Sequence, residues 1–321
     1  MKNLSLFPSY LLRFKTSLHG LCTASLLVFC LLVANVAQAD LTVSEYEAAV
    51  HDRYAAPGSF LLEPLAGSFG SALSGVARQS NGGGWATLIS PSYFLTSAHL
   101  HPPVSADLSQ PLADSVYQFY VEDDLTGPAE ARVVVWGETV AGSDLWLGRF
   151  NEPLPATVRT YPIASQTLVS EATSPTSLFV VGQAGATGMR VGLNGVDALA
   201  SDFSHPSLGA AVGDVFIYDF DPALPGEALV QAGDSGAPSF VEVNGELALA
   251  GIHWFQFATD DEPPVLGTGD TLAATYVDAI ASRLGGESLR VVSVPETPAW
   301  MSVAAAGVGC VIAAVGRRIT I

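Results

Sequence analysis

The sequence alternates short runs of β-branched and aromatic residues with glycine- and proline-bearing turns, and this alternation favours an all-β fold. There are 31 glycines and 20 prolines among 321 residues. Side chains of this kind suit strands, because they pack well on a pleated, half-buried surface. No segment repeats with a period of about 20 to 50 residues, so neither a propeller nor a solenoid is expected. The clearest predicted strands are Val116–Val121, Ala131–Trp136, Ser177–Val181 and Asp214–Asp219.

A single helix is expected near the end of the folded domain. Apolar residues at positions 277, 280 and 284 are three or four residues apart, as they would be on one face of a helix. Gly285 follows them and is a typical helix stop. We therefore predict a helix over Tyr276–Leu284.

The segment Gln231-Ala-Gly-Asp-Ser-Gly-Ala-Pro238 carries the strongest chemical signal, because it places Ser235 between two glycines and ahead of a strand-like run. A serine hydroxyl is a weak nucleophile unless a base lies beside it and an anion site lies ahead of it. Gly233 has no Cβ, so the N–H groups of residues 233 and 235 can point at one developing oxyanion. Taken alone, Gly-Asp-Ser-Gly would also suit a surface turn.

Two further motifs favour the catalytic interpretation. A strand beginning at Trp85, a turn at Pro91-Ser92 and a second strand lead to His99. Asp144 opens an alternating, half-buried run that ends at Phe150. The order histidine, aspartate, serine resembles that of the chymotrypsin/trypsin-like serine proteases. The resemblance implies two six-stranded antiparallel β-barrels with a short C-terminal helix.

The same resemblance assigns the roles of the site residues. Ser235 attacks the scissile carbonyl of a polypeptide substrate, and an acyl-enzyme forms. His99 takes the proton of Ser235 and returns it to the leaving amine, while Asp144 holds the imidazole in the correct tautomer. The N–H groups of Gly233 and Ser235 form the oxyanion hole, and Asp234 anchors the loop. The resemblance implies neither a cofactor nor a metal.

The chain departs from the family in two small residues and in its activation segment. Ala237 stands where the family has glycine, and Ser97 where it has alanine. In many relatives, cleavage before Ile-Val-Gly-Gly makes a new N-terminus, which pairs with the aspartate ahead of the nucleophile. Nothing in residues 55–84 resembles that site, and residues 46–56 match no part of the pattern. Either the oxyanion loop is ordered in another way, or it is not properly formed.

The resemblance also indicates the substrate pocket. Leu229 falls at its base, where a trypsin-like preference for arginine or lysine would need an aspartate. The segment Gly251-Ile-His253-Trp254 resembles a Gly-Ile-His segment of glutamyl endopeptidases, in which the histidine helps to bind an acidic side chain. A histidine on an apolar strand is more often structural. The simpler expectation is an apolar pocket lined by Leu229, Val230 and Phe255.

Both ends of the chain predict export. Residues 1–39 have a basic start, an apolar core and an Ala37-Gln-Ala39 cleavage site, as in a secretory signal peptide, with an uncleaved anchor as the alternative. Near the C-terminus, Val294–Pro298 precedes an apolar stretch over 299–316 that is about 27 Å long as a helix, enough to span a bilayer. Two arginines follow this stretch.

The C-terminal order resembles the PEP-CTERM sorting signal of Gram-negative bacteria, which exosortase-type enzymes process, although Thr297 is inserted. An ordinary tail anchor is the alternative. The predicted organisation is a signal peptide over 1–39, an N-terminal extension over 40–59, a trypsin-like domain over 60–286, and a sorting segment over 287–321 with a transmembrane helix over 299–316.

Composition limits the partners. All three cysteines lie in the two end segments, so the domain is expected to be stabilised by packing without a disulfide. Residues 40–286 contain no lysine and seven arginines against 29 acidic residues, and such a domain would repel a nucleic acid. His99-Leu-His101 alternates as zinc ligands can, but no third ligand has a recognisable spacing. The acidic runs 122–124 and 260–262 suit solvated loops or, alternatively, calcium.

The sequence therefore predicts an exported serine endopeptidase of the cell envelope or the extracellular space. Signal peptidase and an exosortase-type enzyme are its expected processing partners, and the C-terminal helix would hold it at the membrane at least transiently. Two alternatives remain. A catalytically inactive protease-fold binding protein would explain the missing activation site, and an extracellular-matrix protein would explain the sorting tail.

Overall fold

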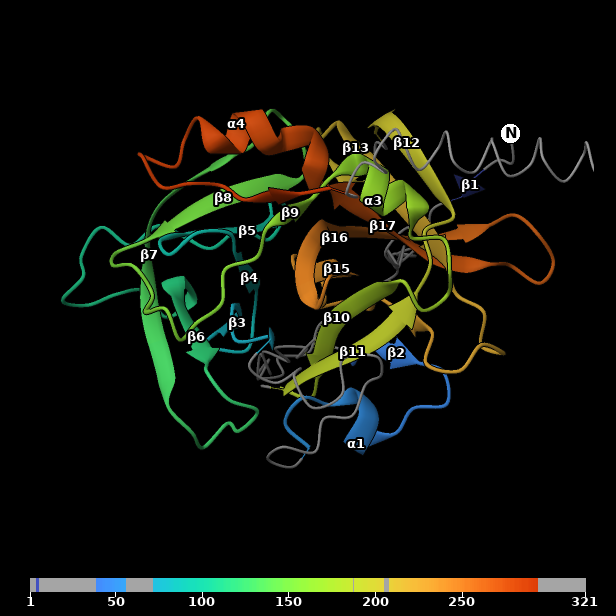
Figure 1. Ribbon diagram of the computed structural model, residues 1–321, viewed down its shortest axis with the longest axis horizontal. Coiled ribbons are helices and arrows are strands. Elements are labelled where there is room, and N and C mark those ends of the chain that lie inside the picture. Colours follow the sequence, from blue (N-terminus) through green and yellow to red (C-terminus); the bar gives the residue numbers. More distant parts are fainter. Residues whose placement is uncertain (1–3, 6–38, 56–71, 187, 205–207, 294–321) are drawn as a thin grey trace, which may run out of the picture.

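The computed structural model describes residues 4–5, 39–55, 72–186, 188–204 and 208–293, and these are mostly β-strands with a few short helices (Figure 1). The all-β prediction is confirmed for this part of the chain. The predicted signal peptide, apart from residues 4, 5 and 39, lies outside the described residues. The whole of the predicted spanning helix also lies outside them.

Six strands close into a barrel in the order β3-β4-β5-β8-β7-β6. Their aromatic side chains fill its centre, where the rings of Phe94 and Phe150 stack 4.4 Å apart. This barrel is the first of the two that the sequence predicts, and it lies on the left in Figure 1. Its strands are β3 (Val76–Gln79), β4 (Trp85–Leu88), β5 (Tyr93–Ser97), β6 (Val116–Tyr120), β7 (Ala129–Thr139) and β8 (Leu145–Phe150).

The second half of the fold is a ten-stranded sheet whose main path runs β11-β10-β15-β16-β17-β13-β12. Off this path, β1 pairs with β16, and β9 pairs in parallel with both β16 and β18. The strands are β1 (Leu4–Ser5), β9 (Ile163–Ala164), β10 (Leu178–Ala184), β11 (Gly188–Asn194), β12 (Ala198–Phe203), β13 (Gly213–Asp219), β15 (Pro238–Val243), β16 (Glu246–Thr259), β17 (Leu266–Leu272) and β18 (Val291–Val292).

The second barrel is not confirmed as a closed barrel. Among the described strands, β11 and β12 are the ends of the sheet path and do not pair with each other. The short strand β14 (Ala228–Leu229) lies between β13 and β15 in sequence, but it pairs with β2 (Thr42–Val43) in a separate two-stranded sheet. A segment of the predicted N-terminal extension is therefore the hydrogen-bonded neighbour of β14.

The helices are short and lie at the periphery (Figure 1). The late helix is present, but it is shorter than predicted, because Tyr276 belongs to a preceding 3-10 turn and the helix ends at Ala281, three residues before Leu284. Two helices of four and six residues were not expected, since so few residues show no helical periodicity. The described helices are α1 (Ala48–His51), η1 (Ala113–Ser115), α3 (Gln166–Glu171), η3 (Ala273–Tyr276) and α4 (Val277–Ala281). None of the helices in the described ranges has the length and apolar character to cross a membrane.

One apolar cluster joins the two halves. It contains Trp85, Leu95 and Leu147 from the first barrel and Phe240 and Ile252 from the second sheet, all of them buried. Burying apolar side chains of this size contributes about 1.5 to 3 kcal/mol each, so the shared cluster fixes the two halves against each other. Side chains contributed by opposite halves can therefore meet in a defined geometry at their junction.

Candidate active site

His99 and Asp144 meet at one end of the first barrel because their strands are paired there. In the antiparallel pair β5 and β8, Ser97 lies opposite Leu145. His99 follows the first of these residues by two positions, and Asp144 precedes the second by one. The backbone N–H of Ala98 donates to the Asp144 carbonyl at 2.8 Å, which continues the ladder to the two side chains.

Both carboxylate oxygens of Asp144 are bound to His99. Oδ1 accepts the backbone N–H of His99 at 3.0 Å, and Oδ2 lies 2.7 Å from the ring atom Nδ1. A carboxylate only accepts hydrogen bonds, so Nδ1 carries the proton and Nε2 is left as the basic nitrogen. The carboxyl group is 2% exposed and the imidazole 33%. Burial raises the pKa of Asp144, and the hydrogen bonds and charge of His99 oppose this rise.

Ser235 lies on the loop between β14 and β15, and this loop packs against the end of β5. The φ of Gly236 is +88°, and a Cβ built on this residue would lie 2.5 Å from Thr96 Oγ1. The backbone of His253 in β16 binds the same loop, because its carbonyl accepts the N–H of Gly236 at 3.1 Å and its N–H donates to the Ala237 carbonyl at 3.0 Å. The contact between Gly236 and Thr96 brings the loop of Ser235 next to the strand that leads to His99.

The neighbouring carboxylate, Asp234, is fully buried, and both its oxygens accept backbone N–H groups. Gln183 N–H donates to Oδ1 and Gln231 N–H donates to Oδ2, each at 2.7 Å. Burial raises the pKa of Asp234 to about 6, although the two N–H groups and the charges of His253 and Arg78 lower it. Within the described fold, Asp234 therefore has two backbone partners.

The turn that carries the oxyanion N–H groups proposed from sequence is bound by a tryptophan side chain. The carbonyl of Gly233 accepts the indole Nε1–H of Trp85 at 3.0 Å, and Gly233 has a φ of +107°, which a side chain would strain. Neither Gly233 N–H nor Ser235 N–H donates a hydrogen bond within the described residues. In the same part of the chain, Ser235 Oγ makes no hydrogen bond to His99. In uncomplexed enzymes, catalytic hydrogen bonds are often long until a substrate binds.

A cavity of about 440 Å³ opens beside Ser235. Leu229, Val230 and Phe255, which were assigned to a substrate pocket from the sequence, all line this cavity, and Trp254 lines it as well. The pairing of β16 with β17 shifts register between residues 253 and 255, and such a bulge turns adjacent side chains toward the same side. Gln231, Ser235 and Gln256 line the cavity too, so apolar and aromatic side chains share its walls with uncharged polar groups.

His253 does not line this cavity. Its side chain is fully buried, with Nδ1 2.8 Å from Asp270 Oδ1 and Nε2 2.8 Å from the Val181 carbonyl. Burial lowers the pKa of His253, but Asp270 and the carbonyl outweigh this effect and the pKa is raised. Two acceptors at its two nitrogens fit a protonated ring that donates to both. The structure thus places His253 in the core, where the histidine makes structural contacts and does not face the cavity.

Several residues at the site carried no signal in the sequence. Trp85, Gln183 and Gln231 each donate a hydrogen bond to the loop of Ser235, and only the folded chain brings these groups together. His101 stacks on the Trp146 ring at 5.5 Å instead of facing His99 as a second metal ligand. No group of three or more potential metal ligands occurs among the described residues. In the acidic run 122–124, Asp123 binds Arg53 at 2.9 Å.

Comparison with known proteins finds only distant similarity. No protein-family model matches the chain, and no curated protein matches it. Among solved structures, the chain is similar to the active form of the Rv3671c protease from M. tuberculosis, with 19% identity over 65% of this chain and 76% of that chain and a TM-score of 0.41. It is also similar to the inactive form of the Rv3671c protease, with 17% identity over 70% of this chain and 95% of that chain and a TM-score of 0.43. Similarity at this level carries no assignment, so the function has to be argued from the site.

Proposed function

We propose that the protein is a serine endopeptidase in which Ser235, His99 and Asp144 form the catalytic triad. The observation that carries this proposal is the doubly bonded His99–Asp144 pair beside the turn that holds Ser235. A buried carboxylate that fixes Nδ1–H leaves Nε2 basic and directed away from it, and this is the state that a general base needs. The packing of Gly236 on Thr96 supports the approach of the nucleophile loop to that base.

The proposed reaction proceeds through an acyl-enzyme. Ser235 Oγ bonds to the scissile carbonyl carbon while its proton passes to Nε2 of His99. The N–H groups of Gly233 and Ser235 stabilise the oxyanion, each by about 3 kcal/mol in the transition state. The imidazolium of His99 then protonates the leaving amine, and the C–N bond breaks. Water enters, is deprotonated by the same nitrogen, and releases the acid and Ser235.

The cavity supports a preference for an apolar residue on the acyl side of the scissile bond. Leu229, Val230 and Phe255 offer no carboxylate to pair with an arginine or lysine, and an unpaired buried charge costs several kcal/mol. An acidic residue would need a cationic partner. His253 has both ring nitrogens bound inside the core, so it supports no such partner here.

We also propose export, with removal of residues 1–39 by signal peptidase and processing of the PEP-CTERM-like segment by an exosortase-type enzyme. The basic, apolar and Ala-Gln-Ala order of the first 39 residues supports the first step. The Pro-Glu-Thr-Pro segment, apolar stretch and paired arginines support the second. Both steps would be tested by purifying the protein from its native cells and determining at which residues its chain begins and ends.

The function is tested by digesting a denatured protein with the purified wild type, Ser235→Ala and His99→Ala. We expect cleavage by the wild type and a loss of about 10⁶-fold in both variants, because triad residues act as a unit. Equal cleavage by the wild type and Ser235→Ala would overturn the proposal.

A non-catalytic binding role is the second candidate, and one observation favours it. Ser235 Oγ makes no hydrogen bond to the His99 ring within the described residues, so the two groups are not paired before a ligand arrives. A wild-type protein that cleaves nothing, but binds an extended apolar peptide in the Leu229 cavity, would support this candidate.

A further inference from the structure

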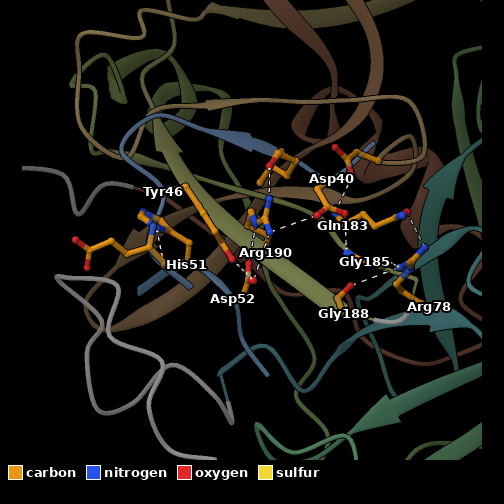
Figure 2. Close-up of polar contacts among 12 residues, drawn as sticks. Asp40, Tyr46, His51, Asp52, Arg78, Gln183, Gly185, Gly188 and Arg190 are labelled. Carbon is orange, nitrogen blue, oxygen red and sulfur yellow. Dashed lines mark hydrogen bonds and ion pairs between the residues drawn. The ribbon is translucent and has the colours of Figure 1, made fainter. Parts of the chain in front are cut away.

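The segment ahead of the first barrel is docked onto β10, which supplies one partner of Asp234, and onto β14, which precedes the other. We call residues 40–44 the N-terminal arm. Figure 2 shows the arm residue Asp40 beside β10 and β11, together with Arg190, Gln183 and Gly185. This arm belongs to the predicted extension and has no part in the triad. Its contacts nevertheless converge on the nucleophile loop from two sides.

The first contact is at β10. Leu41 is fully buried, and its N–H donates to the Gln183 carbonyl at 2.9 Å. The N–H of the same residue, Gln183, donates to Asp234 Oδ1 at 2.7 Å. A Cβ built on Gly182 would lie 2.8 Å from both the Leu41 side chain and the Asp234 carboxyl, so these two groups flank one glycine. Leu41 therefore packs directly behind the support of Asp234.

The second contact is at β14. Thr42 lies opposite Leu229 in the antiparallel pair of β2 and β14, and Thr42 Oγ1 accepts the side-chain N–H of Gln231 at 3.0 Å. The backbone N–H of Gln231 donates to Asp234 Oδ2 at 2.7 Å. Leu229 also lines the cavity beside Ser235. The arm thus braces both the second support of Asp234 and one wall of the pocket.

Charged and polar groups hold the arm in this position. Asp40 accepts the Gly185 N–H at 2.7 Å and lies 3.5 Å from Arg190 (Figure 2). Arg190 donates to the Leu41 carbonyl at 3.0 Å and pairs with Asp52 at 2.7 Å. On the other side of Gln183, Arg78 donates to its side-chain carbonyl at 2.9 Å. Gln183 is therefore bound by the arm, by Arg78 and by Asp234.

We infer that the N-terminal arm, through Leu41 and Thr42, is a positioning segment for the nucleophile loop. With the arm docked, Gln183 and Gln231 keep their N–H groups on Asp234, and Ser235 and the oxyanion N–H groups hold their geometry. With the arm undocked, both supports and the Leu229 wall are released together. The arm acts through peptide N–H groups and a buried leucine, not through a chain-terminal amine. This inference rests on the proposed function of Ser235.

The experiment compares Leu41→Ala with Leu154→Ala and Leu41→Met in the otherwise unaltered protein. Leu154 is equally large and buried, but it packs in the aromatic core of the first barrel, so its truncation is a matched loss of core packing. Two readouts are taken at a temperature where all variants are folded. The first is the rate at which a fluorophosphonate labels Ser235, and the second is hydrogen exchange at the Gln183 and Gln231 amides.

For Leu41→Ala we expect labelling to slow by about 10- to 100-fold and both amides to exchange faster. Leu41→Met should keep both readouts close to those of the wild type, because methionine fills a leucine site well. Leu154→Ala should lower the melting temperature without changing either readout. The inference would be overturned if Leu41→Ala were labelled at the wild-type rate, or if Leu154→Ala slowed labelling as much as Leu41→Ala does. If the wild type itself is not labelled, the proposed function fails, and the exchange rates alone decide whether the arm holds the loop.

Discussion

Replacing Asp234 by asparagine isolates the energetic cost of burying a carboxylate next to Ser235. Burial raises the pKa of Asp234 from 3.8 to about 6. Between these two values the folded protein binds a proton that the unfolded chain has lost, so stability falls as the pH rises. The contribution of Asp234 is fully present below about pH 4 and is lost as the pH rises through about 6, a difference of about 3 kcal/mol.

Asparagine does not titrate, but it can accept only one of the two N–H groups that Gln183 and Gln231 offer, which costs about 1 to 3 kcal/mol at any pH. The free energy of unfolding of both proteins should be measured by urea titration between pH 4 and pH 7.5. We expect the stability of the wild type relative to Asp234→Asn to fall by about 2 to 3 kcal/mol across this range. A pH-independent difference would refute the buried, proton-binding Asp234. Asp261→Asn, on an exposed turn, is the control.

Three further predictions address the site. Asp144→Asn should lower kcat by about 10⁴-fold while the protein stays folded, because the amide presents N–H to Nδ1 and selects the wrong tautomer; a loss below tenfold in a steady-state assay would contradict this role. Gly236→Ala should cost about 2 to 4 kcal/mol by thermal melting, because its Cβ would meet Thr96, whereas Gly245→Ala, with similar φ and open space, should cost less. A peptide-library digest should show cleavage after apolar residues, and a strong preference for arginine or lysine would exclude Leu229 from the base of the pocket.

Five of the six strands of the first barrel were predicted from local sequence patterns, and β3 (Val76–Gln79) was not. The run from Trp85 through Pro91-Ser92 predicts two strands and the turn between them, and β4 and β5 are found there. The pairing of β5 with β8 then brings His99 and Asp144 together, although neither motif specifies the register. The order of the histidine, aspartate and serine motifs along the chain indicated these two residues, whereas their hydrogen bonds depend on the fold.

Other features depend on contacts between distant segments. The sequence shows only that His253 lies on an apolar strand. The folded chain shows that its two ring nitrogens are hydrogen-bonded to Asp270 and to the Val181 carbonyl. The closed second barrel was expected from resemblance. In the structure, β14 pairs with β2, which lies in the predicted N-terminal extension, where the sequence predicted no strand. This pairing is one of the two contacts of the N-terminal arm, and the sequence predicted neither of them.

The central claim is that Ser235 is an activated nucleophile, and covalent labelling with site identification tests it most directly. The purified wild type should be incubated with a fluorophosphonate and digested, and the modified residue should be located by mass spectrometry. We expect one adduct, on Ser235, that is lost in Ser235→Ala and forms much more slowly in His99→Ala. An unlabelled wild type, or an adduct on another serine with Ser235 unmodified, would contradict it.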